Sequence, residues 1–333
     1  MLNKVLIIRF SSLGDIVLTS LAVRCIKKQT GAAVHYLTKA GFSDIVSSNP
    51  YIDKVWLLNK SLNELLPSLK KENYDLIVDL HNNLRSRMLR LSLFTVPAVS
   101  YVKGNFAKWL SVHFKINRFS KKHVAIKYLQ SLNKWNVNDD GMGLDYFIPE
   151  KDKVNTVSIL KHDQPFIALV IGAAHFTKRV PQTKLKEIIS KIKSGYPIVL
   201  IGGKAETEQG DALSQDGVIN TCGQYSINQS ASILAQSAMV ISPDTGMMHI
   251  AAALKKPIRS IWGSTLAEFG FWPYYGNHHP DLNTSFEVKG LSCRPCARFG
   301  RNECPKGHFD CMMKQDFEGI VLATPSIPKV VPS

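Results

Sequence analysis

The sequence has no uninterrupted apolar run approaching the roughly 20 residues that a helix needs to cross a bilayer. Its N-terminal apolar run, Val5-Leu6-Ile7-Ile8, is short and is followed by Arg9, so it does not resemble a secretory signal peptide. These absences argue against an integral membrane protein. We expect a cytoplasmic protein.

Two common phosphate-binding signatures are also missing. The turn after the first expected strand lacks G-x-G-x-x-G, which argues against a dinucleotide-dependent dehydrogenase. No G-x-x-x-x-G-K-[ST] occurs, which argues against a P-loop enzyme. Acidic residues are few: 26 Asp and Glu stand against 41 Lys and Arg, a formal charge of +15. This excess suggests an anionic partner: nucleic acid, an anionic membrane surface or an acidic substrate.

What the chain does contain is an alternation of short apolar strands and helices over 333 residues, a length that suits two domains. Strands are expected at 5–8, 33–37, 55–58 and 76–80, and again at 166–171, 198–201, 239–241 and 258–262. Helices are expected at 16–29, 184–193 and 249–254. The pattern predicts two doubly wound α/β domains, 1–150 and 151–333, whose ligands bind at the carboxyl ends of the strands.

The most informative segment is Ser242-Pro243-Asp244-Thr245-Gly246-Met247-Met248-His249, which follows one expected strand and opens a helix. Gly246 permits a tight turn, and the free N–H groups of the first helical turn form a ready site for phosphate. The alternative is that Asp244 or Thr245 only caps the helix. His249, beside alanines, could equally be a packed core histidine.

A second strand end carries two adjacent cations, in the segment Gly172-Ala173-Ala174-His175-Phe176-Thr177-Lys178-Arg179. The small residues leave room for a ligand. Lys178 suits a phosphate oxygen, and Arg179 can bind one with two hydrogen bonds. The alternative is a solvated basic loop.

Carboxylates follow two further strands. Gly202-Gly203-Lys204-Ala205-Glu206 places Glu206 where it could accept hydrogen bonds from ribose hydroxyls, a weak signal by itself. Arg9-Phe10-Ser11-Ser12-Leu13-Gly14-Asp15 joins the first strand to the first helix. There Asp15 could act as a general base toward an acceptor hydroxyl, or could simply be the N-cap of the helix.

Together, these four segments resemble glycosyltransferase family nine, the ADP-heptose:lipopolysaccharide heptosyltransferases and their relatives. The resemblance extends over nearly the whole chain with the motifs in the same order. One position departs from it: the family commonly has Trp-Pro after the Lys-Arg pair, and this chain has Val180-Pro181. The departure bears on packing and on the fine specificity for the donor.

The resemblance implies a GT-B fold, two Rossmann-like domains facing across a cleft, that works without a metal ion or other cofactor. It implies an acceptor site in 1–150, with Ser11 and Gly14, and a donor site in 151–333. Asp15 would be the catalytic base of an inverting transfer of heptose from ADP-heptose to a lipopolysaccharide inner-core acceptor. Tyr225 falls about where a residue packs on adenine. The implied donor-binding residues are Lys178, Glu206, Asp244, Thr245, Gly246 and His249.

A cluster of arginines follows the strand at 76–80. Arg85 and Arg87 suit the phosphates and carboxylates of an anionic acceptor, with a solvated helix face as the alternative. The basic and aromatic stretch at 103–128 could lie on the inner leaflet of the membrane, where each basic residue adds about 1 kcal/mol, or its aromatic residues could be core.

Four of the six cysteines, Cys293, Cys296, Cys304 and Cys311, have the spacing C-x2-C-x7-C-x6-C near the C-terminus. Only the first pair has zinc spacing. The alternatives are a structural zinc ion and reduced or locally paired thiols. Similar segments occur in many members of the family, so this one does not indicate a new activity.

Two other functions compete with the heptosyltransferase. One is a glycosyltransferase that uses another nucleotide sugar to build a surface polysaccharide. The other is a basic nucleic-acid-binding protein, suggested by the charge alone. Because the chain contains no recognition motif of that class, we expect no nucleic-acid partner.

Overall fold

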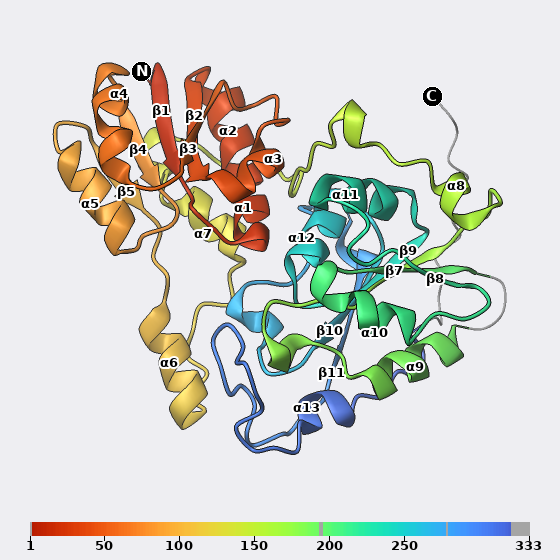
Figure 1. Ribbon diagram of the computed structural model, residues 1–333. Helices are drawn as coiled ribbons and strands as arrows, with labels where there is room; N and C mark the ends of the chain where they lie inside the picture. Colours follow the sequence, from red (N-terminus) through yellow and green to blue (C-terminus); the bar gives the residue numbers. More distant parts are fainter. Residues whose placement is uncertain (1, 193–195, 278, 321–333) are drawn as a thin grey trace.

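The computed structural model describes residues 2–192, 196–277 and 279–320. It contains two α/β halves, at the upper left and at the right of Figure 1. The N-terminal sheet has the strand order β3-β2-β1-β4-β5 and the C-terminal sheet β11-β10-β9-β6-β7-β8. All neighbouring strands within each sheet are parallel. The predicted fold class of two doubly wound sheets is therefore confirmed.

The N-terminal half alternates strands with helices. Its strands are β1 (Lys4–Ile8), β2 (Ala33–Lys39), β3 (Lys54–Leu58), β4 (Leu76–Asp79) and β5 (Ala98–Ser100). Its helices are α1 (Leu13–Leu18), α2 (Ser20–Thr30), α3 (Ser43–Val46), α4 (Leu66–Lys71), α5 (Leu84–Ser92), α6 (Asn105–Phe114) and α7 (Val124–Gln130).

The C-terminal half repeats the pattern. Its strands are β6 (Ile167–Val170), β7 (Ile198–Ile201), β8 (Val218–Asn220), β9 (Met239–Pro243), β10 (Ile258–Trp262) and β11 (Asn283–Glu287). Its helices are α8 (Thr156–Leu160), α9 (Gln182–Lys191), α10 (Thr207–Asp211), α11 (Ile227–Gln236), α12 (Gly246–Ala253) and α13 (Asp310–Met313). Short 3₁₀ helices are η1 (Ala40–Phe42), η2 (Leu62–Glu64), η3 (Asn133–Trp135), η4 (Glu150–Asp152), η5 (Phe176–Lys178), η6 (Lys204–Glu206), η7 (Ala267–Phe269) and η8 (Pro280–Leu282).

The strand orders locate the binding edges. In each sheet the first three strands are added toward one edge and the later strands toward the other. The strand order therefore reverses between β1 and β4 in one half and between β6 and β9 in the other. Ligands of doubly wound sheets bind at this switch point, beyond the carboxyl ends of the strands. The loops after β1, β6 and β9 carry three of the four segments singled out in the sequence, and the fourth follows β7.

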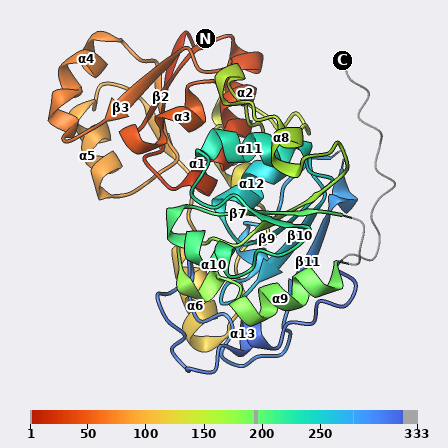
Figure 2. The same ribbon diagram turned by 45° about the vertical axis from the view of Figure 1, so that its right-hand side comes forward.

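One hydrophobic core runs through both halves. Side chains alternate along each strand, so that Val5 and Ile7 of β1 and Ala168 and Val170 of β6 belong to this shared core. The opposite faces of the two sheets pack into two separate clusters. In both ribbon views α1 lies beside α12, at the junction of the halves (Figures 1 and 2).

The structure differs from the sequence prediction in one helix of the N-terminal half and in three short strands. The single helix predicted at 16–29 begins earlier and divides at Thr19, whose buried hydroxyl donates to the carbonyl of Ile16 and hydrogen-bonds Tyr36. Such side-chain bonds to the backbone compete with a continuous helix. The strands β5, β8 and β11 were missed because β5 and β8 have only three residues and β11 is a half-exposed polar edge strand.

The two sheets are joined by a long connection, since β5 ends at Ser100 and β6 begins at Ile167. The predicted domain boundary between 150 and 151 falls inside it and stays a prediction. Both halves hold the connection: Arg24 of α2 pairs with Asp140 at 2.8 Å, and Lys255 after α12 donates to the carbonyl of Met142 at 2.7 Å. Among the described residues, no helix is long and apolar enough to cross a membrane.

Candidate functional site

A cleft of about 530 Å³ lies where the two halves meet, a size that accommodates a nucleotide-sized ligand. Both halves line it, the N-terminal half through the start of α1 and the C-terminal half through the loops after β6, β7 and β9. Most of the residues predicted from the sequence are brought together there, namely Gly14, Asp15, Lys178, Glu206, Tyr225, Asp244, Thr245, Gly246 and His249. Ser11 does not line the cleft, but its neighbour Ser12 does.

Two glycines allow the helix starts to meet. A Cβ atom added to Gly14 of α1 would lie 2.7 Å from Cδ2 of His249 and 3.3 Å from Cα of Gly246. A Cβ atom added to Gly246 would lie 2.5 Å from Cγ of Leu13. The backbones of α1 and α12 therefore approach each other more closely than larger residues would permit. The N-terminal ends of the two helices, which favour anions, share one cleft.

We expect Gly14→Ala to separate these two helix starts. Because the new methyl group meets His249 and the α12 backbone, the substitution should lower stability by about 1–3 kcal/mol, the usual effect of overpacking. Gly41→Ala is the matched control, because nothing lies within 4 Å of its added Cβ. Urea unfolding measures the effect, and equal stability of the two variants would contradict the account.

The carboxylate of Asp15 is held at the start of α1 by three groups: the backbone N–H of Ser12, the hydroxyl of Ser12 and the guanidinium of Arg9. Ser12 is the N-cap, and Asp15 occupies the third helical position of a capping box, so the alternative that Asp15 is the N-cap is wrong. The Ser12 hydroxyl donates to Oδ2 of Asp15 at 2.8 Å. Nη2 of Arg9 lies 2.7 Å from the same oxygen. The carboxylate is partly exposed to the cleft and has a fixed orientation.

Arg9 is the residue that sequence reasoning missed here. It is buried, its Nε donates to the carbonyl of Ser11 at 2.7 Å, and its Nη1 donates to the hydroxyl of Tyr128 at 3.2 Å. Burial by itself would raise the pKa of Asp15, but the charge of Arg9 and the hydrogen bonds from Ser12 outweigh it and lower that pKa. Asp15 is therefore a carboxylate at neutral pH. The signal was available, since Arg9 opens the segment that contains Asp15.

On the other side of the cleft, Lys178 is anchored by Asp244. Nζ of Lys178 lies 2.7 Å from Oδ2 of Asp244, which also accepts a hydrogen bond from Thr265 at 2.9 Å. Thr245 is the N-cap of α12 by position, but its side chain makes no capping hydrogen bond and its hydroxyl lacks a partner among the described residues. The interpretation that Asp244 or Thr245 only caps the helix is therefore not supported by the contacts.

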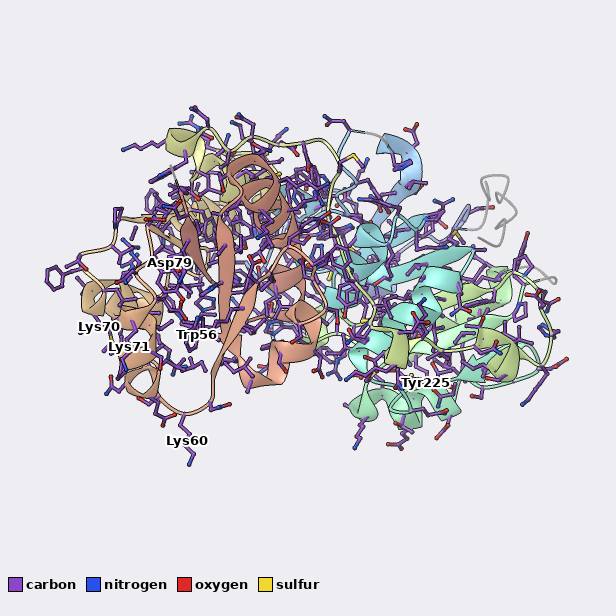
Figure 3. The ribbon with its side chains drawn as sticks, turned by 90° about the horizontal axis from the view of Figure 1, so that it is seen from above. Trp56, Lys60, Lys70, Lys71, Asp79 and Tyr225 are labelled. Atoms are coloured by element: carbon purple, nitrogen blue, oxygen red, sulfur yellow. The ribbon has the colours of Figure 1, made fainter. Side chains whose placement is uncertain are left out.

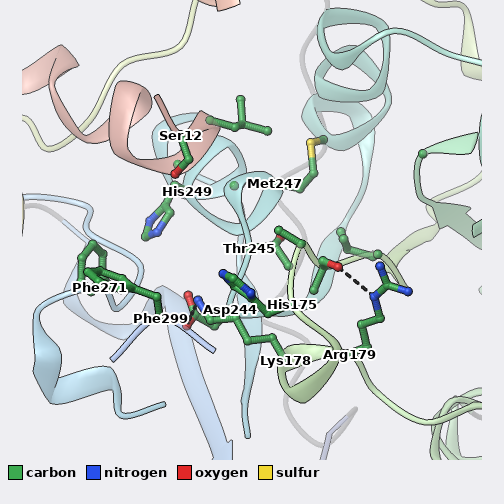
Figure 4. A pocket seen from close by; sticks show the side chains of 18 of the residues that line it. Ser12, His175, Lys178, Arg179, Asp244, Thr245, Met247, His249, Phe271 and Phe299 are labelled. Atoms are coloured by element: carbon green, nitrogen blue, oxygen red, sulfur yellow. Dashed lines mark hydrogen bonds and ion pairs between the residues drawn. The ribbon is translucent and has the colours of Figure 1, made fainter. Parts of the chain in front are cut away.

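His249 is buried on α12 and contributes to the cleft wall. Its Nδ1 has no hydrogen-bond partner among the described residues, which a satisfied core histidine would have. Burial lowers the pKa of His249 to about 4, against the opposing charges of Asp244 and Asp15, so the ring is neutral at neutral pH. Figure 4 shows the ring between Ser12 and Phe271. A neutral imidazole there can hydrogen-bond a ligand.

Glu206 is fixed against the backbone at the cleft wall. Its Oε2 accepts from the backbone N–H of Gly203 at 3.0 Å, and its Oε1 lies 3.7 Å from Nη2 of Arg179. Arg179 also donates to the carbonyl of Ala173 at 2.8 Å, the bond drawn in Figure 4. Arg179 therefore orders the loop and Glu206, and Lys178 is the cation paired with Asp244, just before α12. Tyr225, labelled in Figure 3, is half-buried in the same cleft.

The predicted acceptor arginines lie elsewhere. Arg85 and Arg87 are exposed on α5 and do not line the cleft, and Nε of Arg87 donates to Asn82 at 3.1 Å. Asp79, at the end of β4 and labelled in Figure 3, is fully buried. It accepts hydrogen bonds from the backbone N–H groups of His81 and Asn82 and so shapes the turn after β4. A role of Arg85 and Arg87 in acceptor binding stays a prediction.

The C-terminal cysteines gather below the Lys178 loop. Cys293, Cys296, Cys304 and Cys311 line one small cavity, and all six cysteines of the chain are free. In the part of the chain that the structure describes, no group of three or more His, Cys, Asp or Glu side chains is arranged to hold a metal ion. The segment supports the Lys178 loop: the backbone N–H of Arg301 donates to the hydroxyl of Thr177 at 2.8 Å.

Two Rossmann-like halves with a nucleotide-sized cleft between them define the GT-B class of glycosyltransferase folds. A heptosyltransferase from E. coli, solved with ADP, has this fold: it superposes with a TM-score of 0.64 at 20% sequence identity, over 85% of this chain and 92% of that one. The predicted GT-B fold is confirmed.

Residues 63–294 match the family model of glycosyltransferase family 9 (heptosyltransferase), and the chain belongs to this family. Lipopolysaccharide heptosyltransferase 1 of Campylobacter coli is 26% identical over 290 residues, which cover 79% of this chain and 84% of that protein. Lipopolysaccharide heptosyltransferase 1 of Pseudomonas aeruginosa is 24% identical over 320 residues, 89% and 86% of the two chains. The family predicted from the four segments is thus confirmed.

Proposed function

We propose that the cleft transfers heptose from ADP-heptose to a lipopolysaccharide inner-core acceptor at the inner leaflet, with inversion at the anomeric carbon. The observation that carries the proposal is that one cleft is lined by an ionised carboxylate of the N-terminal half, Asp15, and by a cation of the C-terminal half, Lys178, which is paired with Asp244 just before α12. Relatives named lipopolysaccharide heptosyltransferases and the E. coli structure with ADP support this choice of acceptor and donor.

The donor would lie along the C-terminal wall. The diphosphate would occupy the start of α12, where free backbone N–H groups and the helix dipole favour an anion. Glu206 would accept hydrogen bonds from the ribose hydroxyls, and Tyr225 would pack against the adenine. His249, neutral and with an unpartnered Nδ1, would hydrogen-bond a phosphate or sugar oxygen. Asp244, which carries a like charge to the diphosphate, would act by holding Lys178 in place.

The transfer itself would need one proton acceptor and one cation. An oxygen of the Asp15 carboxylate would take the proton from the acceptor hydroxyl as that oxygen attacks the anomeric carbon from the face opposite the diphosphate. The bond from the anomeric carbon to the diphosphate oxygen would break, and ADP would leave with the bonding electrons. Lys178 and the amides at the start of α12 would stabilise that charge, so the proposal needs no metal ion.

The departure at Val180 bears on the alternative that the donor is another nucleotide sugar. Val180 is buried and packs into the cluster on the far face of the C-terminal sheet. It does not line the cleft. The change from the family's usual tryptophan therefore concerns packing behind the Lys178 loop and gives no reason to replace ADP-heptose as the proposed donor.

Nucleotide selectivity tests the proposed donor. Calorimetry with ADP, UDP, GDP and CMP should show ADP binding at least about tenfold more tightly than the others, a difference of 1.4 kcal/mol. Tyr225→Ala should reduce this preference, because the adenine would lose its packing partner. A preference for another nucleotide would replace the donor within the same enzyme class. Failure of all four to bind would contradict the assignment of the cleft.

A further inference from the structure

Helix α6 has its polar and apolar faces reversed relative to a normal surface helix. Phe106 is 71% exposed and Phe114 is 60% exposed, whereas Lys108 is only 5% exposed and Ser111 is fully buried. Surface helices normally bury apolar residues and expose lysines. An apolar face turned outward marks an interaction site.

The outward rings form one continuous cluster. The ring of Trp109 lies 6.0 Å from that of Phe106, 4.8 Å from that of His113 and 5.5 Å from that of Phe114, measured between centroids. These four residues, which we call the α6 aromatic cluster, share one face of the helix because their spacing follows its turns. Val102 before the helix and Ile116 after it are also exposed.

Positive charge surrounds this cluster. No Asp or Glu occurs from Leu80 to Asn138, while the same stretch contains 11 Lys and Arg, against a net charge of +15 for the whole chain. Exposed Lys115, Arg118, Lys121 and Lys122 directly follow the aromatic face. An aromatic face bordered by lysines, with a tryptophan within it, is the composition of helices that lie in the interface of anionic membranes.

The inward face of α6 joins this helix to the cleft. Nζ of Lys108 lies 4.8 Å from the ring centre of Phe271 and 5.4 Å from that of Phe269, and both rings line the cleft. Lys115 donates to the carbonyl of Pro295 at 2.8 Å, so the helix also contacts a loop of the C-terminal half. Figure 1 shows α6 extending below the N-terminal sheet beside that half.

We infer that the α6 aromatic cluster docks the protein on the surface of an anionic bilayer, with Lys121 and Lys122 facing the lipid headgroups. The rings would enter the boundary between headgroups and acyl chains, and Lys108 would keep the cleft next to that surface. Docking through α6 would bring a lipid-linked acceptor close to Asp15, and this consequence for catalysis rests on the proposed function. The docking itself does not depend on the sugar chemistry.

The apolar rings distinguish a membrane from a nucleic acid. A phosphate backbone is bound through cations and groups that hydrogen-bond, with a strong dependence on salt. Binding to a phosphate backbone alone would give no role to the exposed rings of Phe106, Trp109 and Phe114, which would need bases stacked on them. A bilayer accommodates both parts of the surface at once, the rings in its apolar boundary and the lysines at its phosphates.

Co-sedimentation with vesicles tests the inference. Wild type should bind vesicles of phosphatidylcholine with phosphatidylglycerol and bind vesicles of phosphatidylcholine alone at least about tenfold more weakly. The triple variant Phe106→Ser, Trp109→Ser, Phe114→Ser should lower binding to the mixed vesicles about tenfold or more. The control Met142→Ser, Val157→Ser, Met313→Ser, which removes exposed apolar groups elsewhere, should bind like wild type.

Charge reversal provides the second arm. Lys121→Glu with Lys122→Glu should lower binding to mixed vesicles about tenfold or more. The control Lys60→Glu with Lys70→Glu changes two exposed lysines after β3 and on α4 (labelled in Figure 3) and should have little effect. ADP binding should be unchanged in every variant, which separates this test from that of the cleft. Full vesicle binding by the aromatic triple variant overturns the inference. So does binding to single-stranded RNA that exceeds binding to vesicles.

Discussion

Asp15→Asn should lower the turnover of ADP-heptose about 10²–10⁴-fold, the range that a general base contributes, while leaving the affinity for ADP within about twofold. The reason is that the amide keeps an oxygen for the Ser12 hydroxyl and for Arg9 but cannot accept the acceptor's proton. Because Asp15 lies in the N-terminal half, the proposed ADP site at α12 does not include its carboxylate. Steady-state kinetics and calorimetry measure the two effects separately.

The control for this variant is Asp53→Asn. It also breaks an ion pair of the N-terminal half, the 2.8 Å contact of Asp53 with Lys27, but away from the cleft. Asp53→Asn should keep most of the activity. If Asp15→Asn retained more than about a tenth of wild-type turnover, Asp15 would not be the base.

The pH dependence follows from the lowered pKa of Asp15. A carboxyl group whose pKa is lower in the folded protein stabilises the fold above its unfolded pKa, and this stabilisation is lost as pH falls through the folded value. Arg9 and Ser12 outweigh the effect of burial and place the pKa of Asp15 below the ordinary 3.8. Asp15 should therefore stay ionised throughout the neutral range.

Lys178→Met should lower kcat about 10²–10³-fold, the usual effect of removing one group that stabilises developing charge. The side chain keeps nearly the volume of lysine but loses the ammonium group, so charge on the departing diphosphate would be met only by the amides of α12. Asp244 would lose its partner at 2.7 Å, though it would still accept from Thr265. Lys178→Arg should recover part of the activity.

A matched variant separates this effect from a general loss of positive charge. Lys186→Met removes an exposed lysine of α9 in the same half and should leave kcat unchanged. Thermal unfolding of both variants shows whether either has lost its fold. Equal kcat values for the two variants would remove Lys178 from the mechanism.

Much of the C-terminal wall of the cleft could be predicted because its residues are close in sequence. Asp244, Gly246 and His249 belong to one strand end and one helix start, so local pattern places them together. The parallel sheets then bring Lys178 and Glu206 to the same edge, since the strand order fixes which loops are neighbours. Short motifs at strand ends therefore predicted most of the cleft.

Contacts between the halves could not be predicted in this way. Two contacts, that of Gly14 with His249 and that of Lys108 with Phe269 and Phe271, depend on how two sheets that are distant in the sequence pack together. The exposure of Phe106 and Trp109 was equally open, because an aromatic residue in a helix is usually core and only the packed structure shows which face is covered. The resemblance implied Ser11 in the acceptor site, whereas the structure places its neighbour Ser12 in the cleft wall.

The configuration of the product tests the central claim most directly. Purified protein would be incubated with ADP-heptose and a lipopolysaccharide inner-core acceptor, and the anomeric configuration of the transferred heptose would be assigned by nuclear magnetic resonance. We predict release of ADP and a heptosyl product whose configuration is inverted relative to the donor. Retained configuration, or absence of transfer while ADP still binds, would contradict a single displacement assisted by Asp15 and Lys178.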